Sequence, residues 1–132
     1  MPKFIPVLLT APLALALGSC AQVDSEPEAQ VAYDTSRQCF FTNNINGYSN
    51  APDGPEGQDR LMVHTGVRDR WLFEVVGSCI ELDFAQAIAL DTGSRTSLCT
   101  GAVETLLVPT FGRDRPERCT VRLLGKVTPD PA

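Results

Sequence analysis

The sequence predicts a small, mainly β protein: an antiparallel sandwich or partly open barrel of about six strands, with one short helix and two disulfides. Three observations support this fold class. Apolar and polar residues alternate with a period of two in several short runs, turn residues separate these runs, and four cysteines are spread over the same region. Short alternating runs between turns are typical of half-buried antiparallel strands.

Four runs show the alternation most clearly, and each is expected to form a strand: residues 40–47, 61–65, 71–76 and 119–124. Turns are expected at 50–58, at 66–70 as a tight hairpin, at 92–95 and at 111–117, because glycine, proline and small polar residues gather there. Only the segment 82–89 suits a helix, of one or two turns, with Asp83 as its N-cap. Trp71 and Phe73 are expected in the core, since so small a domain needs its large aromatic side chains inside.

The N-terminal segment has the parts of an export signal. Lys3 supplies a positive charge, residues 4–17 carry no charge, and the run LGSC at 17–20 resembles the lipobox, where bacterial signal peptidase II cuts before a lipid-modified cysteine. The apolar run is too short for a transmembrane helix, which needs about 20 residues, and two prolines interrupt it. We therefore expect residues 1–19 to be a lipoprotein signal peptide and Cys20 to carry the lipid. The alternative is plain secretion after cleavage at the A-x-A site of Ala14 and Ala16.

The residues after Cys20 suggest a location and a domain boundary. Ala21 follows the cysteine, whereas an Asp at this place would suggest retention in the inner membrane by the enterobacterial sorting pattern; the expected location is the outer membrane, facing the periplasm. The stretch 20–36 is rich in acidic residues and poor in large apolar ones, so it is expected to be a lipidated, solvated tether. The folded domain is then expected at 37–128, followed by a disordered tail at 129–132.

The cysteine count supports export independently. The chain has five cysteines, and lipidation of Cys20 leaves four, which favour two disulfides in an oxidising compartment. Of the three connectivities, we expect Cys79 with Cys99, which closes a local loop, and Cys39 with Cys119, which joins the first and last strands. The spacings contain no C-x2-C pair and the single histidine lies near none of these cysteines, so no metal site and no cofactor are expected.

The charge balance limits the partners. The chain has 11 basic and 16 acidic side chains, and removal of residues 1–19 takes away Lys3, which changes the net charge from -5 to -6. An acidic chain argues against nucleic acid or an anionic lipid surface as the main partner. The expected partners are the membrane, through the lipid at Cys20, and an envelope protein or the cell wall.

Several short motifs resemble a known family. The segments CFF at 39–41, INGY at 45–48, GSC at 77–79, CTG at 99–101 and RCTV at 118–121 resemble an uncharacterised proteobacterial family of small envelope lipoproteins, a domain of unknown function. The resemblance covers about residues 37–128. It implies an envelope lipoprotein and brings no catalytic residues with it.

One motif suggests chemistry. The run DTGS at 91–94 is similar to the signature of aspartic proteases, in which two Asp carboxyls share a proton, and a dimer of this chain would supply the pair through Asp91. Arg95 stands beside the motif, where a cation would disturb the shared proton, and few residues separate it from the later LLG element at 123–125. We therefore interpret DTGS as a β-hairpin turn and expect no enzyme activity.

Two further groups of residues are candidates for function. His64 is the only histidine, and its place on the polar side of a strand predicts a surface group rather than a catalytic base. Asn44, Asn46 and Tyr48 form a polar, aromatic-tipped stretch that suits binding of sugar or peptide by hydrogen bonds and stacking. The alternative for this stretch is a strand that runs into a turn, where Asn is favoured.

Together these features predict a lipid-anchored cell-envelope protein that acts as a binding or structural module. A second hypothesis is an inhibitor or accessory factor of an envelope enzyme, although the S-G-x-x-Y motif of lysozyme inhibitors is absent. The third, and least favoured, is the dimeric aspartic protease.

Overall fold

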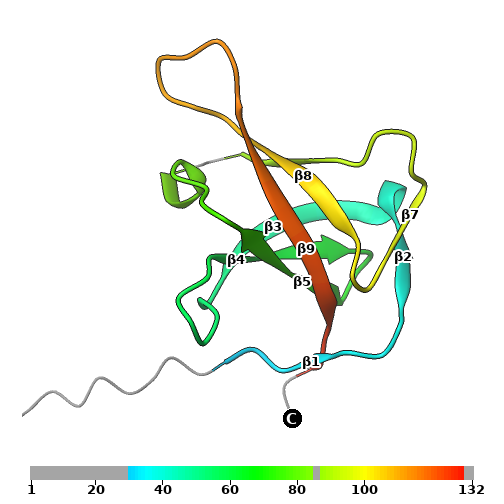
Figure 1. The fold of residues 1–132 in the computed structure, drawn as a ribbon. Coiled ribbons are helices and arrows are strands. Elements are labelled where there is room, and N and C mark those ends of the chain that lie inside the picture. Colours follow the sequence, from blue (N-terminus) through cyan, green and yellow to red (C-terminus); the bar gives the residue numbers. More distant parts are fainter. Residues whose placement is uncertain (1–29, 85–86, 130–132) are drawn as a thin grey trace, which may run out of the picture.

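The computed structural model describes residues 30–84 and 87–129, about half of which form short strands joined by turns (Figure 1). The strands are β1 (Tyr33–Asp34), β2 (Cys39–Phe41), β3 (Ile45–Ala51), β4 (Arg60–Thr65), β5 (Asp69–Val76), β6 (Ala89–Asp91), β7 (Ser97–Cys99), β8 (Val103–Val108) and β9 (Glu117–Val127). Two 3-10 helices of three residues, η1 (Thr42–Asn44) and η2 (Leu82–Phe84), complete the elements. No helix in these described ranges is long and apolar enough to cross a membrane.

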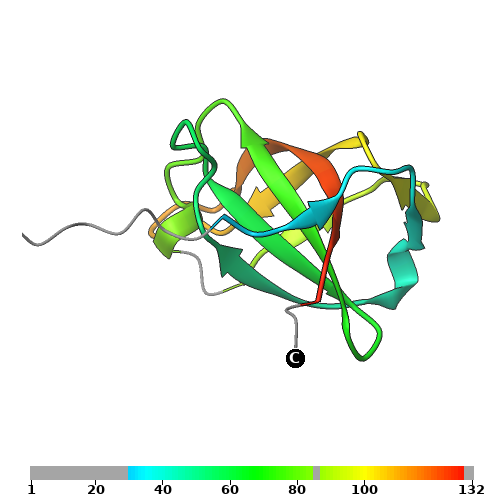
Figure 2. The same cartoon turned by 90° about the horizontal axis from the view of Figure 1, so that it is seen from below.

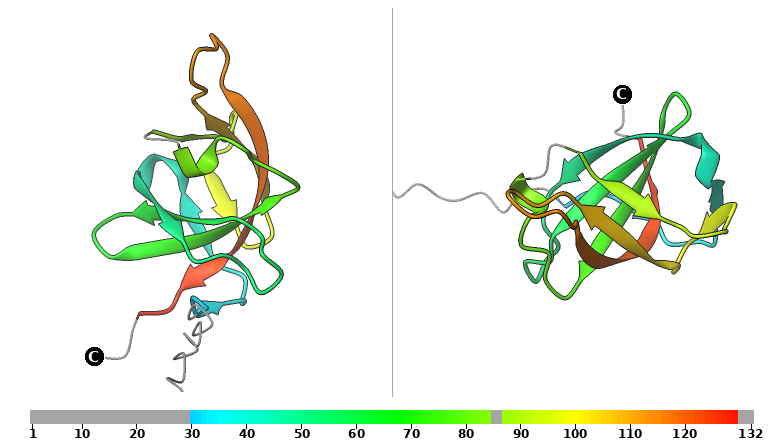
Figure 3. Two further views of the ribbon diagram at one scale, coloured as in Figure 1. Left: turned by 90° about the vertical axis from the view of Figure 1, so that its left-hand side faces the viewer. Right: turned by 90° about the horizontal axis from the view of Figure 1, so that it is seen from above.

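The strands form one large sheet and one small one. The large sheet has the order β3-β4-β5-β9-β8-β6, with β1 added to β9, and it curls into a half-barrel (Figures 2 and 3). Strands β2 and β7 pair separately, and every pairing in both sheets is antiparallel. The predicted fold class, a mainly β protein with a partly open barrel of six strands and two disulfides, is confirmed.

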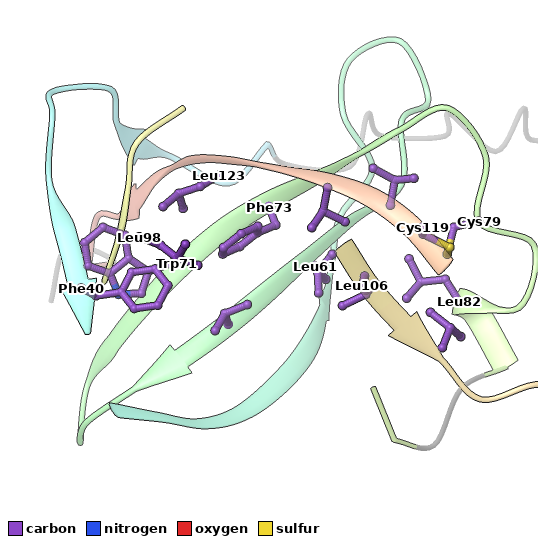
Figure 4. Packing of buried hydrophobic residues seen from close by; sticks show 14 residues of the cluster. Phe40, Leu61, Trp71, Phe73, Cys79, Leu82, Leu98, Leu106, Cys119 and Leu123 are labelled. Atoms are coloured by element: carbon purple, nitrogen blue, oxygen red, sulfur yellow. A yellow bond between two sulfur atoms is a disulfide. The ribbon is translucent and has the colours of Figure 1, made fainter. Parts of the chain in front are cut away.

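The core lies inside the curl of the large sheet (Figure 4). Trp71 and Phe73 are 3% and 0% exposed, which confirms that they belong to the core. The indole Nε1 of Trp71 donates a buried hydrogen bond to Thr65 Oγ1 at 3.0 Å, so its polar atom is satisfied. Along β9 the buried positions alternate with more exposed ones, as expected for a strand with one face on a core.

A second, smaller cluster lies on the other face of the sheet. Met62, Leu72 and Val127 form its buried part, and Val31 and Tyr33 pack against them. Strand β1 therefore covers an apolar patch that β4, β5 and β9 leave on their outer side.

Strand β1 corrects the predicted domain boundary. Tyr33 pairs with Val127 and Asp34 with Lys126, so the fold begins before residue 37. The prediction gave weight to the acidic composition of the stretch and overlooked Val31 and Tyr33, which supply the contacts with the second cluster. The expected signal peptide at 1–19, Cys20, the first part of the tether and residues 130–132 lie outside the described residues.

Two predicted elements differ from the structure. The segment 82–89 forms only η2 before residues 85–86, which lie outside the described ranges, and Ala89 already begins β6, because this part of the chain pairs with β8. The predicted strand 40–47 is interrupted by η1. The Thr42 amide donates to Thr96 O at 2.9 Å, which keeps the chain turned toward β7 until β3 begins.

The disulfide pairing also differs from the prediction. Cys39 is bonded to Cys99 and Cys79 to Cys119. Cys39 and Cys99 are directly opposite each other in the β2–β7 ladder. Cys79 follows the end of β5, and β9 is the neighbour of β5, so Cys79 lies beside the start of β9. The expected pairing was wrong because it assumed that strands near in sequence, or first and last in sequence, are neighbours in space.

Candidate functional site

The opening of the half-barrel lies between its two edge strands, β3 and β6. The backbone N–H of Leu90 donates to the phenol oxygen of Tyr48 at 3.2 Å, so a side chain joins the two edges here. We call this opening, with the surface around it, the seam. It forms a shallow hollow of about 530 Å³, whose lining is Thr42, Asn43, Ile45, Asn46, Gly47, Tyr48, Leu90 and Thr92.

The structure brings two of the three predicted ligand residues together. Asn46 and Tyr48 both line the seam, whereas Asn44 ends η1 and lines a different hollow, next to Cys39. Asn46 Nδ2 donates to the carbonyl of Gly66, which ties the start of β3 to the β4–β5 turn. The amide nitrogen of Asn46 and the phenol oxygen of Tyr48 thus already have partners in the fold. The amide oxygen of Asn46 can still accept a hydrogen bond from a ligand, and the hydroxyl of Tyr48 can still donate one.

A second hollow of about 780 Å³ lies at the base of the β8–β9 loop. The carboxylate of Glu117 accepts the backbone N–H of Ile80 at 3.1 Å and that of Glu81 at 3.0 Å, which fixes the two chain segments to each other. Arg113 and Arg115 line this hollow from the loop itself. The loop projects from the end of the half-barrel that lies opposite β1 (Figures 1 and 3).

The DTGS motif forms a turn in which each carboxylate oxygen of Asp91 has a partner within the chain. Its Oδ1 accepts the N–H of Gly93 at 3.1 Å, and its Oδ2 lies 3.2 Å from Nη2 of Arg118. Gly93 has φ +58°, a conformation that glycine adopts without strain. Arg95, next to the motif, forms an ion pair with Glu104. A carboxyl that shares a proton with a symmetry mate needs an oxygen directed at that mate, and both oxygens here have partners within the chain.

The turn after Asp91 is not a hairpin, contrary to the prediction. Strand β6 before it pairs with β8, and β7 after it pairs with β2, so the turn connects the two sheets. The absence of enzyme activity stays a prediction.

His64 contacts a serine that the sequence did not suggest. Its Nε2 lies 2.7 Å from Oγ of Ser49, across the β3–β4 ladder. A serine nucleophile needs a histidine that a third group orients. Within residues 30–84 and 87–129, no carboxylate is hydrogen-bonded to the other ring nitrogen of His64. Ser49 and His64 therefore form a cross-strand polar pair on the surface.

The described residues include one group with metal-ligand side chains close together: Cys79, Glu117 and Cys119. The two sulfurs are bonded to each other and the Glu117 carboxylate already accepts two backbone N–H groups. This group therefore has no free thiolate to offer a metal.

Comparison with known proteins adds a family. A family model described as a family of unknown function, DUF6491, matches residues 3–132. The chain belongs to DUF6491. No curated protein and no solved structure matches it. Membership in an uncharacterised family, which the short motifs predicted, is confirmed.

The sequence analysis did not predict which residues of this DUF6491 chain line the seam on the side opposite β3. Leu90 lies in β6 and Thr92 directly after it; Leu90 is 42 residues after Tyr48 of β3, and no local pattern connects the two strands. The one available signal was the apolar run IAL at 88–90, whose Ile88 and Leu90 pack against the core.

Proposed function

We propose that this chain is a lipid-anchored protein of the bacterial cell envelope, and that its β domain acts as a binding or structural module. The observation that carries this proposal is the use of its cysteines. Four of the five form two disulfides, which leaves Cys20 as the remaining thiol. Stable disulfides point to an oxidising compartment, and a lipid thioether gives the fifth cysteine a use. Cys20 also ends the lipobox-like run LGSC, and Ala21 after it favours the outer membrane.

The seam supports a binding role for the domain. It is a shallow surface with amide, hydroxyl and aromatic groups side by side, which is the mixture that recognises sugars and extended peptides. The engaged carboxylate of Asp91 speaks against the dimeric aspartic protease. The ligand we propose is a cell-wall glycan or an envelope protein segment, bound through Asn46 and Tyr48.

The lipid anchor is tested by labelling cells with radioactive palmitate and by measuring the mass of the mature N-terminus. We expect label on the wild-type chain, a mature chain that begins at Cys20, and no label on Cys20→Ser. Ser19→Ala, which keeps a small residue before the cut, is the matched control and should retain the label. A mature chain that begins after Ala16, or membrane fractionation unchanged by Cys20→Ser, contradicts the anchor.

The binding role is tested separately with the mature chain that carries Cys20→Ser. We expect it to cosediment with purified peptidoglycan or to capture a periplasmic protein, and we expect Asn46→Ala and Tyr48→Phe to weaken this capture. Asn50→Ala is the matched control, because Asn50 is an exposed residue of β3 outside the seam. Equal capture by all four chains contradicts the seam as the binding surface.

A further inference from the structure

The two disulfides have opposite surroundings. Cys79 and Cys119 are 4% and 3% exposed and belong to the main core cluster, next to Leu82 (Figure 4). Cys39 is exposed and Cys99 is half-buried, and they join the two strands of the small β2–β7 sheet. One disulfide is therefore enclosed by the core, and the other lies at the surface.

A hollow of about 230 Å³ leads to the surface disulfide. It is lined by Cys39 together with Phe41, Asn44, Asp69, Trp71 and Lys126, among others. The ammonium of Lys126 lies 3.2 Å from the carboxylate of Asp69 and 5.8 Å from the centroid of the Trp71 ring. Lys126 lines the same hollow as Cys39, and a cation on the path to a disulfide favours the approach of a thiolate, which is the species that attacks it.

We propose that Cys39–Cys99 is a thiol–disulfide exchange site that takes a dithiol as its substrate, whereas Cys79–Cys119 stays oxidised as a structural bond. A thiolate of the dithiol attacks Sγ of Cys39, the more exposed residue of the pair; a mixed disulfide forms and Cys99 leaves as a thiolate. The second thiolate of the dithiol then attacks its own sulfur in the mixed disulfide and releases Cys39. The dithiol loses two electrons and becomes a disulfide, and the two cysteines of the chain gain them and take up two protons.

Reduction of Cys39–Cys99 removes the covalent link between β2 and β7 but leaves the backbone hydrogen bonds beside it. The amide of Thr42 still donates to Thr96 O at 2.9 Å and that of Thr100 to Gln38 O at 3.0 Å, so backbone hydrogen bonds flank the cysteines on both sides. Phe40 of β2 packs on Trp71 with ring centroids 4.7 Å apart. Looser pairing of β2 and β7 thus changes the surroundings of the only tryptophan, whose fluorescence reports the reaction.

The experiment follows both disulfides in the same molecule. The mature chain with Cys20→Ser is treated with dithiothreitol in native buffer, quenched with N-ethylmaleimide at intervals, and analysed by peptide mass mapping. We expect Cys39 and Cys99 to be alkylated at least about tenfold faster than Cys79 and Cys119, because the buried pair reacts only after the core opens locally. In guanidinium chloride the two rates should become nearly equal. Equal rates in native buffer, or faster alkylation of the buried pair, overturn the proposal.

Two further measurements test the route and the kind of dithiol. Lys126→Gln should slow the reduction of Cys39–Cys99 about threefold, as expected for the loss of a cation near an attacking anion, while Lys126→Arg keeps the rate. An unchanged rate in Lys126→Gln overturns the hollow as the route of approach. The reduction of Cys39–Cys99 by a protein with a C-x-x-C dithiol is compared with its reduction by dithiothreitol. If the protein reacts at a much lower concentration than dithiothreitol, the site is assigned to a protein partner. If only dithiothreitol reacts, the site is assigned to small dithiols.

Discussion

Gly125 in β9 lies where β1 crosses the large sheet, and its replacement by alanine tests whether β1 is part of the fold. A methyl group at this position would have the carbonyl carbon of Asp34 at 3.0 Å and Cδ2 of Tyr33 at 3.1 Å, with the carbonyl oxygen of Asp34 closer still. Two of these atoms belong to the backbone, so no side-chain rotation relieves the contact. We expect Gly125→Ala to push β1 away from β9.

The size of the effect follows from the geometry. Carbon atoms in contact normally lie about 3.5–4.0 Å apart, so the carbonyl carbon of Asp34 alone requires β1 to move by about 0.5 Å, and the closer carbonyl oxygen requires a larger shift. Overpacking of this kind costs about 1–3 kcal/mol. Complete detachment would cost more, because it breaks the two register pairs of β1 with β9, the hydrogen bond from Thr128 N to Ala32 O at 3.0 Å and the packing of Val31 and Tyr33 on the second apolar cluster. A shift of β1 that keeps most of these contacts is therefore the response that costs less. We therefore expect a loss of about 2 kcal/mol.

Urea unfolding followed by the fluorescence of Trp71 measures this loss, and hydrogen exchange of the segment 30–36 shows whether β1 is released. Gly47→Ala is the matched control, because a methyl there meets only Cβ of His64 at an ordinary 3.9 Å. If Gly125→Ala is as stable as Gly47→Ala within about 0.5 kcal/mol, and β1 keeps its protection, the reasoning is refuted.

Four other predictions use the same unfolding assay. Phe73→Ala removes a fully buried ring and should cost about 3–5 kcal/mol; a loss below about 1 kcal/mol would contradict its place in the core. Glu74→Gln leaves Arg60 buried without the carboxylate that lies 2.7 Å from its Nη2. The expected loss of unfolding free energy is about 2–3 kcal/mol, somewhat less than for a fully buried ion pair because the Glu74 side chain is 20% exposed. An unchanged urea midpoint would show that water replaces the carboxylate. Burial, with repulsion from two nearby carboxylates, raises the pKa of Asp59, so its charge opposes folding at neutral pH and the penalty disappears as pH falls through the folded pKa. Asp59→Asn should therefore stabilise the domain at pH 7 and have no effect near pH 3. Asp34 has the opposite sign, because hydrogen bonds from the backbone and side chain of Ser36 lower its pKa: Asp34→Asn should destabilise the domain above pH 4, and the difference should vanish as pH falls through the lowered pKa.

The parts of the fold that the sequence predicts are those set by local patterns. Alternation of apolar and polar residues identified β4, β5 and β9. Burial repeats every two residues along β9, whereas β4 and β5 contain continuous buried runs because a second apolar cluster covers part of their outer face. Strand β1 has only two residues and no such repeat, and its place depends on Gly125, which is distant in sequence. The Cys79–Cys119 bond depends on β9 lying beside β5, and the Cys39–Cys99 bond depends on the pairing of β2 with β7; both are properties of the strand order rather than of any segment.

The candidate site shows the same limit. Asn46 and Tyr48 both line the seam, but the register of β3 with β4 shifts between Ile45 and Gly47, so alternation with a period of two does not by itself place these two side chains together. Asn44 ends η1 and is not part of the strand. Leu90 approaches from the opposite edge of the sheet, and only the closure of the half-barrel brings it to Tyr48.

The place of β1 also decides which surfaces a membrane-bound domain would present. Under the proposed lipid at Cys20, nine residues separate the anchor from Gln30, the first described residue. Nine extended residues span at most about 32 Å, so the β1 end of the half-barrel must stay within that distance of the bilayer. The β8–β9 loop, with Arg113 and Arg115, lies at the opposite end and would point away from the membrane (Figures 1 and 3). A cross-link between Arg113→Cys and lipid head groups, formed as readily as one from Arg37→Cys near β1, would contradict this orientation.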